Sequence, residues 1–116
     1  MSTDTQTHEQ DAEGRQLCTT SGEPPSKVQA EQTEKTGRHK AYIVLCEAER
    51  AKGFVRPYRD RYQHTTCGGV TTVALPLSET YARDPHFYDQ TFCVQCDAHF
   101  PVGEFTWTAD NQRVGS

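Results

Sequence analysis

The chain has 116 residues and a formal net charge of -4, and its hydrophobic content of 34% accompanies a mean hydropathy of -0.82. Such a low apolar content indicates that part of the chain is unfolded or that something besides burial holds it together. The longest apolar run, residues 41–46, is far shorter than the ~18 residues that cross a bilayer. Residues 1–16 contain no apolar stretch, and the number of cysteines, five, is odd. These features argue against a membrane protein and a secreted disulfide framework, so we expect a soluble, cytoplasmic protein with no membrane partner.

Charge is segregated along the chain in three blocks. Residues 1–37 hold three basic and seven acidic residues, residues 38–62 hold seven and three, and residues 63–116 hold two and six. The first block also lacks Phe, Tyr and Trp, so it cannot bury enough apolar surface to offset the entropy of ordering its backbone. We predict a disordered acidic arm over residues 1–37, in which Cys18 has no evident partner.

The basic block, residues 38–62, predicts a helix followed by an extended segment. Strong helix formers precede Gly53, which favours a short helix that ends at Lys52 and contains Cys46 as a buried thiol. Pro57 prevents continuation, so residues 54–62 are expected to be extended, with arginines between aromatic residues. This segment is typical of an edge strand with solvated arginines. The alternative is a nucleic-acid surface formed by Arg50, Lys52, Arg56, Tyr58, Arg59, Arg61 and Tyr62.

Three short runs in the last block, residues 70–73, 91–94 and 104–108, contain the β-branched and aromatic residues that suit strands. Between the first two, residues 77–83 predict a short helix that Ser78 caps and that ends before Pro85. The pattern predicts a small α+β fold, a zinc-ribbon-like metal-stabilised mini-domain with short β-hairpins and one or two short helices. Its expected core around the metal consists of Phe87, Tyr88, Phe92, Phe100, Phe105 and Trp107, rather than an exposed platform for stacking bases.

The strongest motif consists of two pairs of potential metal ligands, each pair separated by two residues. His64 and Cys67 form the first pair, and Cys93 and Cys96 form the second after 25 intervening residues. A pair with this spacing can wrap a tight turn so that both side chains reach one ion, and two such turns complete the tetrahedral shell of structural zinc. We therefore predict one structural Zn²⁺ ion held by these four residues.

The residues that follow each pair support this interpretation. A left-handed backbone is often needed there, and Gly68 accepts it freely while Asp97 tolerates it better than most residues. A closed shell leaves no position for a catalytic water, so we expect a structural staple. Such a site supplies about 10–16 kcal/mol of apparent folding free energy, whereas a core of this size supplies about 3–5 kcal/mol. A sulfur-rich shell also accepts iron, so that metal stays open.

Two alternatives compete with the assigned ligands. His99 or His86 could replace His64 as the fourth ligand, and His64 is preferred on spacing alone. Cys93 and Cys96 could instead form a redox dithiol, but the strand–helix–strand context of a thioredoxin-like fold is missing.

Enzyme signatures are not found in the chain. The zinc-deaminase pattern, a Gly-rich phosphate loop, HExxH and GxSxG are all missing. A compact His-centred nuclease would draw on the histidines and on Asp84, Asp89 and Asp97, but nothing in their order indicates one. We therefore expect no catalytic residues.

Residues 49–116 resemble an uncharacterised family of small proteins from bacteriophage and prophage genomes. The resemblance rests on AERAKGFVRP at residues 48–57, on the turn after Cys67, on ETYARDP with FY at residues 79–88, and on the region from Cys93 to Trp107. It implies a phage accessory protein with a zinc-ribbon-like domain, and it transfers no activity and no catalytic residues.

We expect residues 41–114 to form one mini-domain in which the basic block packs on a zinc-ribbon-like domain at residues 63–116. The leading function is a non-catalytic adaptor in the host cytoplasm that contacts another protein, because the acidic ribbon would be repelled by phosphates. The first alternative is a nucleic-acid-binding zinc-ribbon protein that uses residues 38–62, and the second is a metal-dependent nuclease. The identity of the partner and the oligomeric state are left open.

Overall fold

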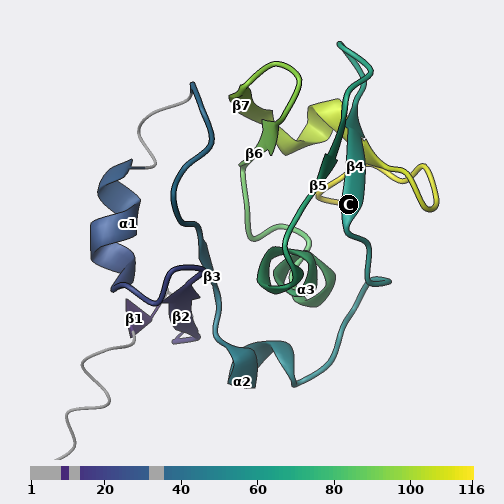
Figure 1. Ribbon diagram of the computed structural model, residues 1–116. Helices are drawn as coiled ribbons and strands as arrows, with labels where there is room; N and C mark the ends of the chain where they lie inside the picture. The colour runs from purple at the N-terminus through teal and green to yellow at the C-terminus, as the bar shows by residue number, and fades with distance from the viewer. Residues whose placement is uncertain (1–8, 11–13, 32–35) are drawn as a thin grey trace, which may run out of the picture.

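The computed structural model describes residues 9–10, 14–31 and 36–116. Its strands are short, and it contains three α-helices and one 3-10 helix among the described residues (Figure 1). The strands are β1 (Glu9–Gln10), β2 (Gln16–Thr19), β3 (Ile43–Leu45), β4 (Arg61–His64), β5 (Val70–Thr72), β6 (Gln90–Cys93), β7 (Ala98–Pro101) and β8 (Phe105–Trp107). The helices are α1 (Pro25–Glu31), α2 (Glu47–Arg50), α3 (Leu75–Arg83) and the 3-10 helix η2 (Val102–Glu104). A small α+β fold with short antiparallel strands is confirmed.

The strands form three small antiparallel sheets, with the orders β1-β2-β3, β5-β4-β8 and β6-β7. Strands β1 and β2 and helix α1 lie on one side of β3, and the second and third sheets and α3 lie on its other side, with α3 below β4 and β5 in the view of Figure 1. We call residues 14–31 and 36–46 together the N-terminal segment and residues 61–116 the C-terminal region. The predicted runs at 70–73, 91–94 and 104–108 correspond to β5, β6 and β8.

The helix predicted to end at Lys52 is wrong over its first half. Residues Ile43–Leu45 form β3, and only Glu47–Arg50 are helical. The cause is long-range pairing, because β3 aligns with β2 through the pair Cys18↔Val44 and contains two β-branched residues that suit a strand. Gly53 follows the short helix with a φ of +121°, which agrees with a glycine beyond the helix end.

The predicted disordered arm differs from the structure over residues 14–31, which contain β2 and α1. Residues 1–8, 11–13 and 32–35 of the arm lie outside the described residues. A disulfide joins Cys18 to Cys46, with a Cα–Cα distance of 4.9 Å. Cys18 therefore has a partner, and Cys46 is not a free thiol. This bond and the pairing of β2 with β3 compensate for the low apolar content of the segment.

Helix α3 confirms the helix predicted between the first two strands, although Ser78 is not its cap. Ala74 occupies the N-cap position, and Pro76 stands in the first turn, where a missing N–H leaves no backbone hydrogen bond unmade. The Ser78 hydroxyl donates instead to the Ala74 carbonyl at 3.1 Å. Asp84 is the C-cap before Pro85, as predicted.

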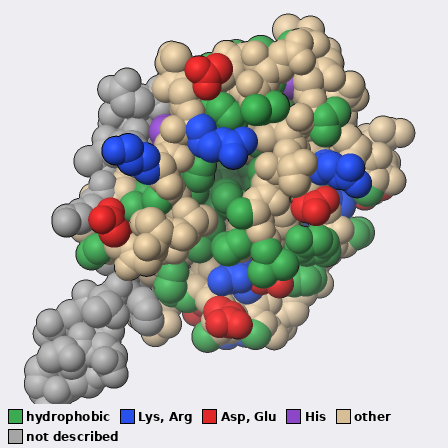
Figure 2. Space-filling view, viewed as in Figure 1, with side chains coloured by type: hydrophobic (Ala, Val, Ile, Leu, Met, Phe, Trp, Pro, Cys, Tyr) green, Lys and Arg blue, Asp and Glu red, His purple; other side chains and the backbone are tan. Residues whose placement is uncertain are grey.

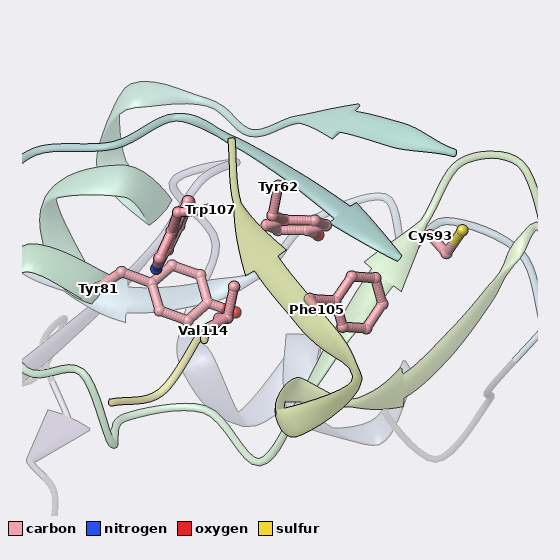
Figure 3. Close-up of a cluster of buried hydrophobic side chains, with 6 residues drawn as sticks. All are labelled: Tyr62, Tyr81, Cys93, Phe105, Trp107 and Val114. Carbon is pink, nitrogen blue, oxygen red and sulfur yellow. The ribbon is translucent and has the colours of Figure 1, made fainter. Parts of the chain in front are cut away.

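The central core lies between α3 and the C-terminal strands. Aromatic side chains from β4, α3 and β8 point toward one another (Figure 3). Tyr62 is fully buried, and its ring meets Phe105 and Trp107 edge to face at centroid distances of 4.9 Å and 5.7 Å. The buried set is Tyr62, Tyr81, Cys93, Phe105, Trp107 and Val114. The predicted core is confirmed for Phe92, Phe105 and Trp107, which are buried, and Tyr88 and Phe100 are partly buried against it. The prediction lacked Tyr62 and Tyr81.

Among the described residues, no helix is long and apolar enough to cross a membrane.

Candidate metal centre

Four side chains converge where β4 and β6 end. His64 is the last residue of β4 and Cys93 the last of β6, and Cys67 and Cys96 lie in the turns that follow these strands. Their potential ligand atoms all lie within 4.8 Å of one another. The cluster could therefore hold a metal ion, and it consists of the four residues selected by their spacing.

Both turns have the backbone that the motif predicts. The N–H of Gly68 donates to the His64 carbonyl at 2.7 Å, and the N–H of Asp97 donates to the Cys93 carbonyl at 2.8 Å. Gly68 has a φ of +79° and Asp97 a φ of +55°, so both residues are left-handed. The predicted conformation is confirmed at both positions.

Backbone donors point at the thiols of the cluster. The N–H of Gly69 donates to Cys67 Sγ at 3.3 Å, and the N–H of Cys96 donates to Cys93 Sγ at 3.4 Å. The Gly69 hydrogen bond lowers the pKa of Cys67 to about 7, whereas hydrogen bonding with Cys67 raises the pKa of Cys96 to about 12. Cys67 therefore loses its proton near neutral pH. Ionisation of the Cys96 thiol is then unfavourable unless a cation offsets the negative charge.

His64 is oriented by a carboxylate that sequence reasoning missed. Its Nε2 lies 2.8 Å from Glu104 Oε1, and its Nδ1 lies 3.6 Å from Cys96 Sγ. Burial by itself would lower the pKa of His64, but the hydrogen bonds with Glu104 and Cys67 raise it above the ordinary value. When Nε2–H donates a hydrogen bond to Glu104, the neutral ring leaves a lone pair on Nδ1, which faces the cluster.

Packing fixes the same imidazole ring. His64 is only 1% exposed, and its ring contacts those of Phe100 and Phe105 at centroid distances of 4.5 Å and 4.6 Å. A ring that is packed against two aromatic side chains and held at Nε2 has little freedom to turn away from the thiols.

Two of the distances between ligand atoms match those around a tetrahedral ion. Metal–sulfur bonds of ~2.3 Å and metal–nitrogen bonds of ~2.0 Å place neighbouring ligands about 3.5–3.8 Å apart in a tetrahedron. Cys67 Sγ and Cys93 Sγ are 3.5 Å apart, and Cys96 Sγ and His64 Nδ1 are 3.6 Å apart. Three sulfurs and one nitrogen suit zinc and are also accepted by iron. The identity of the metal stays a prediction.

The two rival histidines lie elsewhere. His99 is buried against His39, with ring centroids 4.2 Å apart, and its Nε2 lies 2.8 Å from the Tyr42 hydroxyl. His86 is exposed in the turn after α3. Neither belongs to the four-residue cluster.

Three of the seven residues of the predicted nucleic-acid surface are buried or paired within the fold. Tyr62 is buried in the core, and Arg50 pairs with Glu79 and donates to the Leu45 carbonyl at 2.8 Å. Arg59 is also buried, pairs with Asp110 at 3.1 Å, and its guanidinium lies 4.9 Å from the centroid of the Trp107 ring. These three residues are not available to a nucleic acid. The remaining four are Lys52, Arg56, Tyr58 and Arg61, all exposed.

The exposed residues include a continuous stretch, residues 51–58, which we call the 51–58 loop. Phe54, Val55 and Tyr58 are 45%, 58% and 44% exposed. The backbone N–H groups of Val55 and Arg56 both donate to the Ala82 carbonyl, at 2.9 Å and 3.1 Å. The loop thus presents apolar side chains on a backbone anchored to the end of α3.

No protein-family model, curated protein or solved structure matches this chain.

Proposed function

We propose that this chain is a non-catalytic interaction module, held together by one structural zinc ion, that contacts another protein through the 51–58 loop. The observation that carries the proposal is the loop itself, where Phe54, Val55 and Tyr58 are exposed together on an anchored backbone. Exposed apolar side chains that gather in one place mark interaction sites more often than scattered ones do.

The chemistry of the cluster supports a structural role for the ion. His64, Cys67, Cys93 and Cys96 would supply a complete tetrahedral shell, so a bound zinc would have no open position for substrate or water. When bound, the ion would neutralise the thiolates and cross-link the ends of β4 and β6. Glu104 would hold the His64 ring in the ligating tautomer.

A protein is preferred over a nucleic acid as the partner because several cationic side chains are already paired within the fold. Arg50 and Arg59 are paired within the fold, and Tyr62 is buried. Lys52 lies 3.0 Å from Glu49, which offsets part of its charge. The partner would therefore offer apolar side chains to the loop and an acidic group to Arg56. If the resemblance to the phage family holds, this partner is a phage or host protein.

A photo-cross-linking experiment tests this surface. p-Benzoylphenylalanine replaces Tyr58 in one protein and Val94, an equally exposed residue near the cluster, in a matched control. We expect one partner to be cross-linked from position 58 and not from position 94. The purified partner should then bind Phe54→Ser at least about tenfold more weakly than wild type, and Leu75→Ser, altered at another exposed residue, with unchanged affinity. Equal cross-linking from both positions would contradict the proposal.

A nucleic-acid titration separates the alternative. Fluorescence anisotropy with single-stranded DNA and RNA should show no binding in the micromolar range at physiological salt. Binding that weakens steeply with salt and is lost in Arg56→Gln with Arg61→Gln would instead establish the nucleic-acid function.

A further inference from the structure

A cavity of about 170 Å³ lies between the N-terminal segment and the C-terminal region. Residues 38–42 form one wall, the connection from β5 into α3 forms another, and β6 contributes the third side. Figure 2 shows a hollow near the centre of this face, with hydrophobic side chains deep inside and Lys or Arg side chains at the rim. The metal cluster contributes none of the residues that line it.

The cavity walls combine aromatic rings with positive charge. Five aromatic side chains contribute to the lining: Tyr42, Tyr62, Tyr81, Tyr88 and Phe92. Arg38 and Lys40 also line it, and among the described residues that do so there is no Asp or Glu. The Arg38 guanidinium lies 4.9 Å from the centroid of the Phe92 ring, so its position over an aromatic wall is defined. A site of this kind favours a planar ligand that carries negative charge.

The tyrosine hydroxyls at the walls are used or enclosed within the fold. The Tyr62 hydroxyl donates to the Phe92 carbonyl at 2.6 Å, and the Tyr88 hydroxyl donates to the Ile43 carbonyl at 2.5 Å. The Tyr81 hydroxyl is buried. These tyrosines therefore offer a ligand their rings rather than their hydroxyls, and the charged contact falls to Arg38.

We propose that this cavity binds a small, single-ring aromatic carboxylate, with its ring among the tyrosine and phenylalanine side chains and its carboxylate near Arg38. The size agrees, since a cavity of about 150 Å³ accepts one benzene molecule. This site goes beyond the proposed protein contact and does not depend on it.

The test is a set of ligands matched in size and different in charge. Benzoate, 4-hydroxybenzoate, benzyl alcohol and benzylamine are each titrated into the full metal-loaded chain and followed by ¹H–¹⁵N NMR. We expect benzoate and 4-hydroxybenzoate to bind, benzyl alcohol to bind weakly, and benzylamine not to bind at all. The shifted amides should lie in residues 38–42 and 88–92. Equal shifts from benzoate and benzylamine, or shifts confined to other regions, would overturn the proposal.

Variants locate the charged contact. Arg38→Gln should weaken benzoate binding about tenfold, because a charged hydrogen bond is lost, and should leave benzyl alcohol unaffected. Arg61→Gln is the matched control, since Arg61 is exposed and does not line the cavity. Equal losses in Arg38→Gln and Arg61→Gln would show that the assigned contact is wrong.

A variant that fills the cavity but keeps the fold shows whether a loss of ligand binding is due to the cavity or to misfolding. Thr72 lines the cavity and is exposed on β5, so Thr72→Phe should fill the entrance while the strand is kept. We expect the variant to retain its metal and its NMR dispersion and to lose binding of all the ligands. Full binding by this folded variant would place the ligand elsewhere and refute the proposal.

Discussion

The N-terminal segment and the C-terminal region use cysteine in two different ways. In the C-terminal region, Cys67, Cys93 and Cys96 lie in tight turns beside His64, in an arrangement that suits a metal ion. In the N-terminal segment, Cys18 reaches a partner 28 residues away, Cys46, and forms a disulfide. The first arrangement depends on local spacing and the second on the approach of distant strands. The disulfide joins two parts of the N-terminal segment, and a bound ion would join the ends of β4 and β6, so variants of the two sets of cysteines can be compared.

The largest expected effect follows from removal of the metal staple. Cys93→Ser should abolish metal binding, and the C-terminal region should unfold, because a structural site of this kind contributes about 10–16 kcal/mol. Inductively coupled plasma mass spectrometry should find one zinc per wild-type chain and none in the variant, and NMR should show collapsed dispersion. A wild-type protein that folds equally well without metal would contradict the structural role.

Removal of the disulfide should have a smaller and separate effect. The double variant Cys18→Ser with Cys46→Ser should lose about 2–4 kcal/mol in free energy of unfolding, because an unfolded chain without the cross-link has more conformational entropy. Chemical denaturation measures this loss, and the metal content should be unchanged. If the double variant also loses its metal, the two staples are not independent and the comparison fails.

The turns that follow β4 and β6 lie close together at Gly69 and Gln95, and a substitution there tests the C-terminal site on its own. A Cβ added at Gly69 would lie 2.6 Å from Gln95 Cβ, a distance that forces one turn away from the other. Gly69→Ala should therefore cost about 1–3 kcal/mol and weaken metal binding. Gly103→Ala is the matched control, since its nearest neighbour would be Arg113 Cδ at 3.9 Å and its stability should hardly change. Equal behaviour of the two variants in thermal denaturation would refute the clash.

The smallest expected effect concerns the carboxylate behind His64. Glu104→Gln should weaken metal affinity about 10–100-fold in chelator competition, whereas Glu47→Gln, an exposed acid far along the chain, should not change it. Metal affinity should also depend on pH, because protonation of His64 competes with metal binding. The hydrogen bond with Glu104 helps to raise the pKa of His64, so metal affinity should fall as pH decreases through that raised pKa, and Glu104→Gln should move this fall to lower pH.

Much of the candidate site could be predicted because its geometry is local. Two residues between ligands define a tight turn, and Gly68 and Asp97 indicate the left-handed step that ends each turn. Glu104 could not be found in this way, since it reaches His64 from 40 residues away. Burial of Tyr62 had a signal that was missed: in β4, Tyr62 and His64 are buried and alternate with exposed Arg61 and Gln63.

The fold of the N-terminal segment could not be predicted for a different physical reason. Residues 43–45 are compatible with helix or strand, and pairing with β2 decides between them. Cys18 and Cys46 carry no spacing motif, so only the fold brings them together. The same holds for the cavity, whose walls come from residues 38–42 and from strands far along the chain. Long-range contacts, rather than weak propensities, limit what the sequence reveals here.

The coexistence of the Cys18–Cys46 disulfide with three free thiols imposes an order on the biogenesis of the protein. Thiolates react with disulfides, so an oxidant that meets the metal-free chain can join any of its five cysteines. A metal ion that binds first would occupy Cys67, Cys93 and Cys96 and leave one pair to be oxidised. Metallation before oxidation would therefore yield a single product, and the reverse order a mixture of mispaired chains.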